Sequence, residues 1–320
     1  MLYVPESVSQ KLVTRPMALA AMRDAFIAAA DGSATSFPAL QGIGRDAAHR
    51  FSVKSARVNS ARLTGLKIGA YWPSSDTAGL SRGSSVVLFL DDVTGRVEAI
   101  VQTNEANAYR TSAAAALAVQ LLARPDAETL TVFGAGYQAF HQVMAIREVR
   151  DVRRVFIVNR TVESAQALIG RLEETDIEAR TASPQHGCSN GDIIVTVTAS
   201  KGALFEDAWV KPGTHVSCLG ADNRGKQELP VGLLRRARLF ADLMPQSVEI
   251  GEFQHVASEF ASGTVRIDTL GEVAGGTKPG RQSRDDITIF DSSGIALQDL
   301  FLAKMILEEC QTKNETVLIP

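Results

Sequence analysis

One stretch near the middle of the chain restricts the possible folds more than any other. It reads Thr-Leu-Thr-Val-Phe-Gly-Ala-Gly-Tyr-Gln-Ala from Thr129 to Ala139, a short apolar run that ends in two glycines and precedes a helical pattern. A strand that turns at a glycine and opens a helix is typical of dinucleotide binding. Gly134 is expected to make the tight turn, Gly136 to let backbone amides approach the pyrophosphate, and Ala139 to allow close packing of helix on strand. An ordinary glycine-rich turn is the alternative.

The order of elements after this stretch predicts one complete domain. Short apolar runs alternate with helical patterns, and the candidate strands are 129–133, 155–158, 193–197, 215–218, 239–242 and 287–290. Such alternation indicates a parallel, doubly wound sheet. The last helix, 295–310, has no strand after it in this interpretation. We expect it to pack back on the first part of the chain, which would make that domain discontinuous.

The first third of the chain has a different pattern. An amphipathic helix is expected over 16–30, after Thr14 and before Gly32. Runs typical of strands follow at 50–58, 63–71, 84–90 and 97–102, and they indicate a mixed or antiparallel sheet. An alanine-rich helix over 105–123 ends at Arg124-Pro125-Asp126, so the first domain boundary is predicted after residue 124.

Composition and charge argue against several classes of protein. The net charge of −3 provides no general attraction to nucleic acid or to an anionic membrane surface. The three cysteines are widely spaced and form no metal-binding pair, so no metal site is expected. No apolar run reaches membrane-spanning length, and the N-terminus lacks the pattern of a secretory signal. A cytoplasmic protein is therefore the expectation.

The residues after the second strand of the nucleotide fold bear on the choice of coenzyme. An Asp or Glu at this place would bind the ribose hydroxyls and repel a 2′-phosphate, but the chain has Asn159, Arg160 and Thr161 instead. Asn159 can donate to a phosphate, and Arg160 can pair with it or stack on adenine. The pattern favours NADP over NAD. The alternative is that Arg160 is a solvated surface residue and that NAD binds without the acid.

Three further residues are candidates for chemistry. Asp222 lies just past the strand 215–218, where ligands bind in parallel sheets, and its carboxylate could exchange a proton with a substrate. Arg110 lies near the start of the alanine-rich helix and could bind a carboxylate through two parallel hydrogen bonds. Lys67 lies within a half-buried strand, where an unpaired lysine is uncommon. A turn-forming Asp, a solvated helix arginine and a snorkelling lysine are the alternatives.

Taken together, the motifs resemble the ornithine cyclodeaminase/mu-crystallin family. The matching segments, in order, are Leu-Thr-Gly-Leu-Lys-Ile-Gly, Tyr-Arg-Thr-Ser-Ala-Ala-Ala, Phe-Gly-Ala-Gly-Tyr-Gln-Ala, Val-Asn-Arg-Thr and Gly-Ala-Asp-Asn-Arg-Gly-Lys-Gln-Glu-Leu. The resemblance implies an α/β protein with a Rossmann-type doubly wound parallel sheet over 125–294. It also implies a discontinuous α+β substrate-binding and dimerisation domain, 1–124 completed by 295–320, and a homodimer.

The resemblance also assigns roles to residues. It implies that Lys67 and Arg110 bind the substrate carboxylate and that Asp222 is the catalytic acid or base, with Lys67 as the second catalytic residue. Ser293 matches the segment that closes the nicotinamide end. From the fingerprint and the resemblance together, the residues expected to contact the coenzyme are Gly134, Ala135, Gly136, Tyr137, Gln138, Asn159, Arg160, Thr161, Thr196, Val197, Thr198 and Ser293.

The chain departs from the family where the far end of the substrate would bind. Many members carry an arginine shortly after a proline near position 40, whereas here the nearest arginine is Arg45. Lys54 stands where many members have methionine. Residues 45–67 carry several cations and one acid, which suits a substrate with a second carboxylate. Arg45 and Lys54 are therefore candidate ligands, although alternate strand positions could point to solvent.

The function expected from this resemblance is NAD(P)H-dependent reduction of α-imino acids to L-amino acids. Iminosuccinate, which would give L-aspartate, is the substrate that the extra cations favour. The open alternatives are ornithine cyclodeaminase, which releases ammonia, a pyrroline-2-carboxylate or ketimine reductase, and a non-enzymatic protein that binds NADPH and a small ligand.

Overall fold

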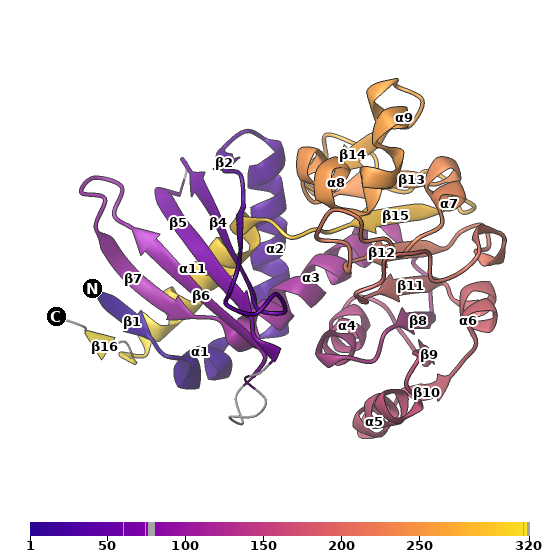
Figure 1. Cartoon of the computed structure of the whole chain (residues 1–320), viewed down its shortest axis with the longest axis horizontal. Coiled ribbons are helices and arrows are strands. Elements are labelled where there is room, and N and C mark those ends of the chain that lie inside the picture. Colours follow the sequence, from indigo (N-terminus) through magenta and orange to yellow (C-terminus); the bar gives the residue numbers. More distant parts are fainter. Residues whose placement is uncertain (60, 74, 76–80, 316, 319–320) are drawn as a thin grey trace. The chain divides into compact units, whose positions relative to one another are not determined.

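The chain divides into two units, and the second is inserted into the first. In the computed structural model, which describes residues 1–59, 61–73, 75, 81–315 and 317–318, unit 1 comprises Met1–Arg110 and Ile295–Pro320, and unit 2 comprises Thr111–Gly294 (Figure 1). The first junction lies inside helix α3 (Asn104–Leu122), earlier than the expected boundary after residue 124. The reason is that Val119 and Ala123 pack in the core of unit 2, where Arg150 donates to their carbonyl oxygens.

Unit 1 is built on one mixed sheet. Its order is β16-β1-β7-β6-β5-β4-β2, with β3 paired to β4. Strands β4 to β7 form an antiparallel ladder, whereas β1 runs parallel to β7. The strands are β1 Leu2–Val4, β2 Ala34–Ser36, β3 Leu40–Ile43, β4 Arg50–Val58, β5 Leu63–Tyr71, β6 Gly83–Leu90, β7 Val97–Gln102 and β16 Val317–Leu318. The expectation that no strand follows the last helix was therefore wrong, because β16 pairs with β1.

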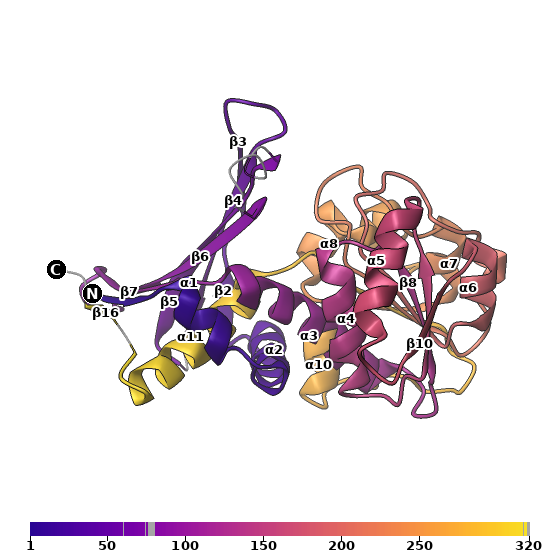
Figure 2. The ribbon, with the colours of Figure 1, turned by 90° about the horizontal axis from the view of Figure 1, so that it is seen from below.

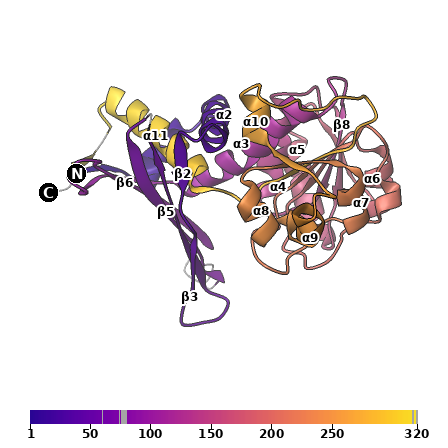
Figure 3. The same ribbon diagram turned by 90° about the horizontal axis from the view of Figure 1, so that it is seen from above.

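Three helices cover one face of this sheet: α1 (Glu6–Leu12), α2 (Arg15–Ala30) and α11 (Ala296–Thr312) (Figures 2 and 3). The helix α2 begins where Thr14 accepts the amide of Met17, a capping contact that its sequence predicts. On the covered face α11 packs so closely on β5 that a Cβ at Gly65 would lie 2.8 Å from Leu300. Lys67 lies on this same face, two positions along β5, because side chains alternate.

The start of α3 is fixed by unit 1. The carboxylate of Glu6 accepts the backbone amides of Asn104 and Glu105 at 2.8 and 2.9 Å. These amides have no partner inside the helix, and a negative charge at a helix N-terminus is favourable. The first two turns of α3, which carry Asn107 and Arg110, are thereby anchored to the sheet domain.

Unit 2 is a parallel sheet of order β10-β9-β8-β11-β12-β15-β13-β14. The chain runs from β8 outward to β10 and then returns to the other side of β8, so its topological switch point lies between β8 and β11. Apolar side chains on opposite faces of the strands form two cores: Ile193 and Val195 lie in one, and Ile194 in the other. This confirms the expected α/β class with a doubly wound sheet.

The strands of unit 2 are β8 Thr129–Phe133, β9 Arg154–Val158, β10 Glu178–Thr181, β11 Ile193–Thr196, β12 His215–Cys218, β13 Arg238–Ala241, β14 Ile267–Thr269 and β15 Thr288–Asp291. Its helices are α4 Tyr137–Arg147, α5 Val162–Leu172, α6 Pro184–Asn190, α7 Val231–Arg236, α8 Met244–Ile250, α9 Ala257–Ala261 and α10 Leu270–Ala274, with single 3-10 turns at Asp207–Trp209 and Glu252–Val256. Among the described helices of either unit, none combines the length and apolarity needed to cross a membrane.

Candidate functional site

The glycine-rich segment Gly134 to Gly136 forms a turn, and the space next to Gly136 is open. Gly134 has a positive φ of 107°, and a Cβ there would lie 3.0 Å from the carbonyl oxygen of Val197 across the switch point. Gly136 is the N-cap of α4, and a Cβ on it would meet nothing within 4 Å. Ala139 is fully buried against the strand, as expected. Open space before the N-terminus of an eleven-residue helix fits a pyrophosphate, which would take the amides of Ala135 to Gln138 as donors.

The next strand end carries the residues expected at the adenosine ribose. Asn159 and Thr161 follow β9, and the side-chain amide of Asn159 donates to the carbonyl oxygen of Thr161 at 2.8 Å. Arg160 is exposed and forms no ion pair with any residue in the described part of the chain. Its guanidinium is therefore not committed to a partner within those residues.

The ends of β11 and β12 are joined by a carboxylate that we did not predict. Glu228 is fully buried, and it accepts the hydroxyl of Thr196 at 2.7 Å, both the amide and the hydroxyl of Thr198 at 2.7 Å, and the amide of Gly220 at 2.8 Å. Burial raises the pKa of Glu228, while these hydrogen bonds oppose the rise. Val197 lies between the two threonines, so the whole expected coenzyme-contacting segment 196–198 is held by one side chain.

Two more buried carboxylates support this one. Glu252 accepts the backbone amides of Glu228 and Leu229 at 2.7 to 3.1 Å. Burial is the main cause that raises the pKa of Glu252 to about 8, and the nearby charge of Glu228 adds to it. Asp291 in turn accepts the amide of Glu252 at 3.1 Å. The three side chains form a series that runs through the interior of unit 2.

Asp222 and Ser293 lie at two further strand ends. Asp222 follows β12 and is exposed, with its carboxylate 2.6 Å from the ammonium of Lys226 and 2.8 Å from the side-chain amide of Asn223. Ser293 follows β15 and accepts the side-chain amide of Gln246 at 2.8 Å. The carboxylate of Asp242 fixes the same segment by accepting the amide of Gly294 at 2.7 Å.

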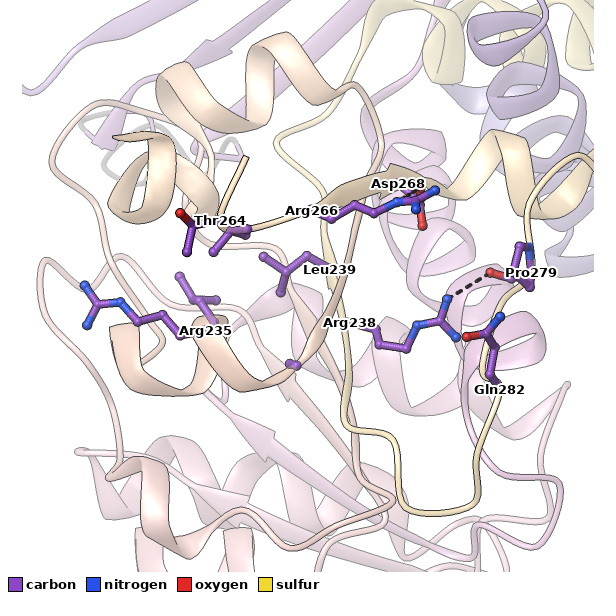
Figure 4. A pocket seen from close by; sticks show the side chains of 11 residues that line it. Arg235, Arg238, Leu239, Thr264, Arg266, Asp268, Pro279 and Gln282 are labelled. Atoms are coloured by element: carbon purple, nitrogen blue, oxygen red, sulfur yellow. Dashed lines mark hydrogen bonds and ion pairs between the residues drawn. The ribbon is translucent and has the colours of Figure 1, made fainter. Parts of the chain in front are cut away.

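All of these residues lie at one edge of the sheet. They follow β8, β9, β11, β12 and β15, and since every pairing in this sheet is parallel, the carboxyl ends of the strands meet at the same edge. A surface pocket of about 370 Å³ lies elsewhere in unit 2, next to the start of β13 at Arg238 and of β14 at Ile267 (Figure 4). Those are amino ends, and we assign no role in the site to this pocket.

Unit 1 contains a second group of candidate side chains, which is centred on Lys67. The lysine is 7% exposed, and its ammonium donates to Asn107 Oδ1 and Asp299 Oδ1, both at 2.6 Å. Arg110 donates to Asn107 Oδ1 from Nη2 at 2.8 Å and to Gln298 Oε1 from Nη1 at 3.2 Å, and its Nε lies 3.3 Å from Asp299 Oδ1. Lys67 and Arg110, expected from the sequence to act together, are thus in one network.

The charges in this network affect one another strongly. Burial, together with the positive charges of Arg110 and Lys54, lowers the pKa of Lys67 to about 7, although Asp299 opposes the shift. Burial raises the pKa of Asp299, but the charges of Arg110 and Lys67 outweigh it, and the pKa lies below its usual value. The group is therefore a buried carboxylate surrounded by cations, a composition that binds anions.

The two candidates for the substrate's far end differ in position. Lys54 on β4 is paired in register with Lys67 on β5 and is half-buried, so it belongs to the same group. Arg45 lies in the exposed loop between β3 and β4, which is closed by the amide of Gly44 donating to the carbonyl of His49. None of the contacts described for residues 1–59 links Arg45 to Lys67 or Arg110, and its role remains a prediction.

Comparison with known proteins identifies the family. The sequence model of the ornithine cyclodeaminase/mu-crystallin family matches residues 1–314. The chain belongs to this family. Among its relatives, the iminosuccinate reductase of Paracoccus denitrificans is 36% identical over 98% of both chains, and the alanine dehydrogenase of Archaeoglobus fulgidus is 32% identical over 95% of this chain and 94% of that one.

Solved structures of family members agree in fold over the whole chain. The crystal structure of the Paracoccus denitrificans iminosuccinate reductase in complex with NAD+ has a TM-score of 0.93 and 34% identity, covering 100% of this chain and 99% of that one. A dimeric archaeal alanine dehydrogenase with bound NAD has a TM-score of 0.91 and 29% identity, covering 100% and 99%. The family resemblance expected from the motifs is therefore confirmed.

Several residues of this ornithine cyclodeaminase/mu-crystallin family member were missed by sequence reasoning. In unit 1 they are Asn107, Gln298 and Asp299, and in unit 2 they are Glu228 and Asp242. A signal existed for Asp299, because an acid on the buried side of an otherwise apolar helix needs a partner, and Lys67 was an unpartnered buried cation. Glu228 stood inside a motif already quoted, but its polar neighbours in sequence gave no reason to expect full burial.

Proposed function

We propose that this protein is an NAD(P)H-dependent imine reductase that converts α-imino acids to L-amino acids. The observation that carries the proposal is the buried cationic group of Lys67, Arg110 and Lys54 around Asp299, in a chain whose other unit has a dinucleotide fingerprint at its switch point. A site for a small carboxylate together with a coenzyme site suits an amino-acid oxidoreductase. Relatives named iminosuccinate reductase and alanine dehydrogenase support the same reaction class.

Each residue has a defined task in this proposal. A bound nicotinamide coenzyme would supply the hydride. Lys67 and Arg110 hold the α-carboxylate through charge-assisted hydrogen bonds, which restricts the orientation of the imine carbon. Asp222 exchanges the proton with the substrate nitrogen, directly or through water. Glu228 keeps segment 196–198 and Gly220 in place, so that the backbone facing the coenzyme does not have to reorganise.

We propose a dicarboxylic imine, such as iminosuccinate, as the substrate. Lys67, Arg110 and Lys54 bring cationic side chains close to the one carboxylate of Asp299. A substrate with two carboxylates suits such a cationic group, whereas the terminal ammonium of ornithine would be repelled. Lys54 is the residue expected to meet the second carboxylate. The 36% identity to an iminosuccinate reductase is in agreement with this choice.

We infer that NADPH binds at least as well as NADH. No acid follows β9, and the guanidinium of Arg160 is exposed, which suits a 2′-phosphate. The similar iminosuccinate reductase structure contains NAD+, so activity with both coenzymes is expected.

We also propose that the protein works as a homodimer through the uncovered face of the unit 1 sheet. Helices cover the face that carries Lys67, but the opposite face carries Val53, Leu66, Ile68 and Leu88, which are partly exposed, Ile68 by 36%. An apolar sheet face of this kind suits association with a second copy. Ile68→Asp should convert the dimer to a monomer in light scattering. Val93→Asp, in an exposed turn away from that face, should leave it dimeric.

The proposed activity is tested with the purified protein, oxaloacetate or pyruvate with ammonia, a cyclic imino acid, and NADH or NADPH. We expect coenzyme oxidation with oxaloacetate and ammonia to be preferred. Lys54→Met should lower kcat/KM for oxaloacetate and ammonia far more than for pyruvate and ammonia, because only the former loses a charge partner. Equal losses would reject the dicarboxylate. Ammonia release from ornithine without net coenzyme turnover, or coenzyme binding without turnover on any imine, would reject the reductase.

A further inference from the structure

The carboxylate of Asp299 joins three separate parts of unit 1. It lies in the first turn of α11 and contacts Lys67 on β5 and Arg110 on α3 at 2.6 and 3.3 Å. Its side chain is 3% exposed. A buried ionised carboxylate is costly, and replacing such an ion group by apolar residues is often neutral or stabilising. Stability of the fold is therefore a weak reason for its presence, and a role in the site is a better one.

Two of the three N–H groups of the Lys67 ammonium have an acceptor among the described residues. An ammonium has three N–H groups, and among the described residues Asn107 Oδ1 and Asp299 Oδ1 accept two of them at 2.6 Å each. Asn107 Oδ1 also accepts from Nε and Nη2 of Arg110, so the lysine and the arginine share one acceptor. The two acceptors fix the direction of the third N–H of Lys67. A ligand carboxylate would be a partner of suitable charge for this donor.

Because of the charges around Lys67, its protonation state depends on Asp299. Lys54 faces it from β4, Arg110 from α3 and Asp299 from α11, while Asn107 and Gln298 are the neutral members of the group. Among the described neighbours, Arg110 and Lys54 are cations that lower the pKa of Lys67, whereas Asp299 raises it. Without the charge of Asp299, the buried ammonium would lose its proton at a lower pH.

We propose that Asp299 is a positioning residue of the carboxylate-binding site, one that holds Lys67 and Arg110 in a single arrangement and lets Lys67 bind the substrate as an ammonium. This inference rests on the proposed function for the identity of the ligand, and it adds a residue for which sequence motifs assigned no role. It differs from a purely structural ion pair because it requires a change in anion binding with pH.

The experiment measures succinate binding by calorimetry to the NADH-bound protein between about pH 6.5 and 9. For the wild type, Kd should rise by up to tenfold for each pH unit above about 7, where Lys67 loses its proton. In Asp299→Asn the rise in Kd should begin at lower pH. Near pH 7.5 the Kd of the variant should be at least about tenfold higher than that of the wild type, while the two Kd values differ much less at pH 6.5. Because the wild type and the variant are compared at the same pH, the protonation of succinate itself affects both Kd values equally.

Two further variants make the result specific. Lys54→Met should move the midpoint of the same profile to higher pH, because Lys54 lowers the pKa of Lys67, and this variant serves if Asp299→Asn does not fold. Asp268→Asn is the matched control: its side chain is 12% exposed and ion-paired with Arg266 and Lys278, but it belongs to unit 2. It should leave the profile unchanged.

The outcomes separate this inference from the proposed function. Unchanged midpoints in Asp299→Asn and in Lys54→Met, or tighter succinate binding by Asp299→Asn near pH 7.5, would overturn the positioning role, since the carboxylate would then act as a structural or competing anion. A wild type that binds succinate with the expected profile but reduces no imine would reject the reductase while supporting the role of Asp299.

Discussion

Glu252 makes the stability of unit 2 depend on pH in a direction that can be worked out. Its side chain is fully buried, and burial raises its pKa from the ordinary 4.5 to about 8. Between these two values the folded protein keeps a proton that the unfolded chain has lost. The stabilisation by protonation is therefore complete below pH 4.5 and is lost as pH rises toward 8.

The size of the effect follows from the two pKa values. Each unit of difference corresponds to about 1.4 kcal/mol, and integration from about pH 5.5 to 8.5 gives a loss of about 3 kcal/mol in the free energy of unfolding. In Glu252→Gln the side chain cannot ionise, yet it keeps the equivalent of Oε1, which accepts the amides of both Glu228 and Leu229. The stability difference between variant and wild type should therefore shift by about 3 kcal/mol toward the variant over this range.

The assay is urea unfolding of both proteins at several pH values, followed by tryptophan fluorescence. The chain has two tryptophans, and Trp209 lies in unit 2. Replacing Trp72 by Phe in both proteins makes the signal report on that unit alone. Subtracting the two curves cancels every other titrating group. A difference that stays constant between pH 5.5 and 8.5 would refute the reasoning and show that Glu252 does not retain its proton.

Three other predictions concern the coenzyme side. Asp222→Asn should leave NADH binding intact but reduce turnover by roughly 10²–10⁴-fold, the usual contribution of a general acid, and near wild-type turnover would reject the assignment. Arg160→Ala should weaken NADPH binding by roughly tenfold with little change for NADH in fluorescence titrations, because only NADPH loses a charged partner; equal losses would indicate stacking. Gly220→Ala should lower the free energy of unfolding by about 1–3 kcal/mol and weaken NADH binding, since its Cβ would lie 2.1 Å from the carbonyl oxygen of Thr198. Gly202→Ala is the control, because a Cβ there meets open space, and it should leave thermal unfolding unchanged.

The sequence predicted the elements whose signals are local. The strands 50–58, 63–71, 129–133 and 215–218 have the expected bounds, because each is an apolar or alternating run between turn residues. Strands β1 and β16 were missed, since runs of three and two residues carry no period, and their pairing depends on chain ends far apart in sequence. The domain junction inside α3 was missed because a continuous helical pattern does not show which unit each turn packs on.

For the candidate site, the sequence identified charged residues but not their partners. Lys67 was conspicuous because a lysine in a buried strand needs a counter-charge. That counter-charge, Asp299, lies 232 positions further along the chain, and no local pattern connects the two. Glu228 was missed for a similar reason, because the groups that contact it, Thr196, Gly220 and Glu252, lie at other places in the chain.

The insertion of unit 2 into unit 1 places the residues proposed for the coenzyme and those proposed for the substrate carboxylate in different segments of the chain. Only two junctions, at Arg110–Thr111 and Gly294–Ile295, separate the units. Every residue assigned to the carboxylate site falls outside 111–294, and every residue assigned to the coenzyme falls inside it. On the proposed assignments, exchange of that one segment between relatives is expected to transfer coenzyme preference together with Asp222, while the carboxylate-binding residues stay with the recipient. A family organised in this way can diversify its substrates and its coenzymes by independent genetic events.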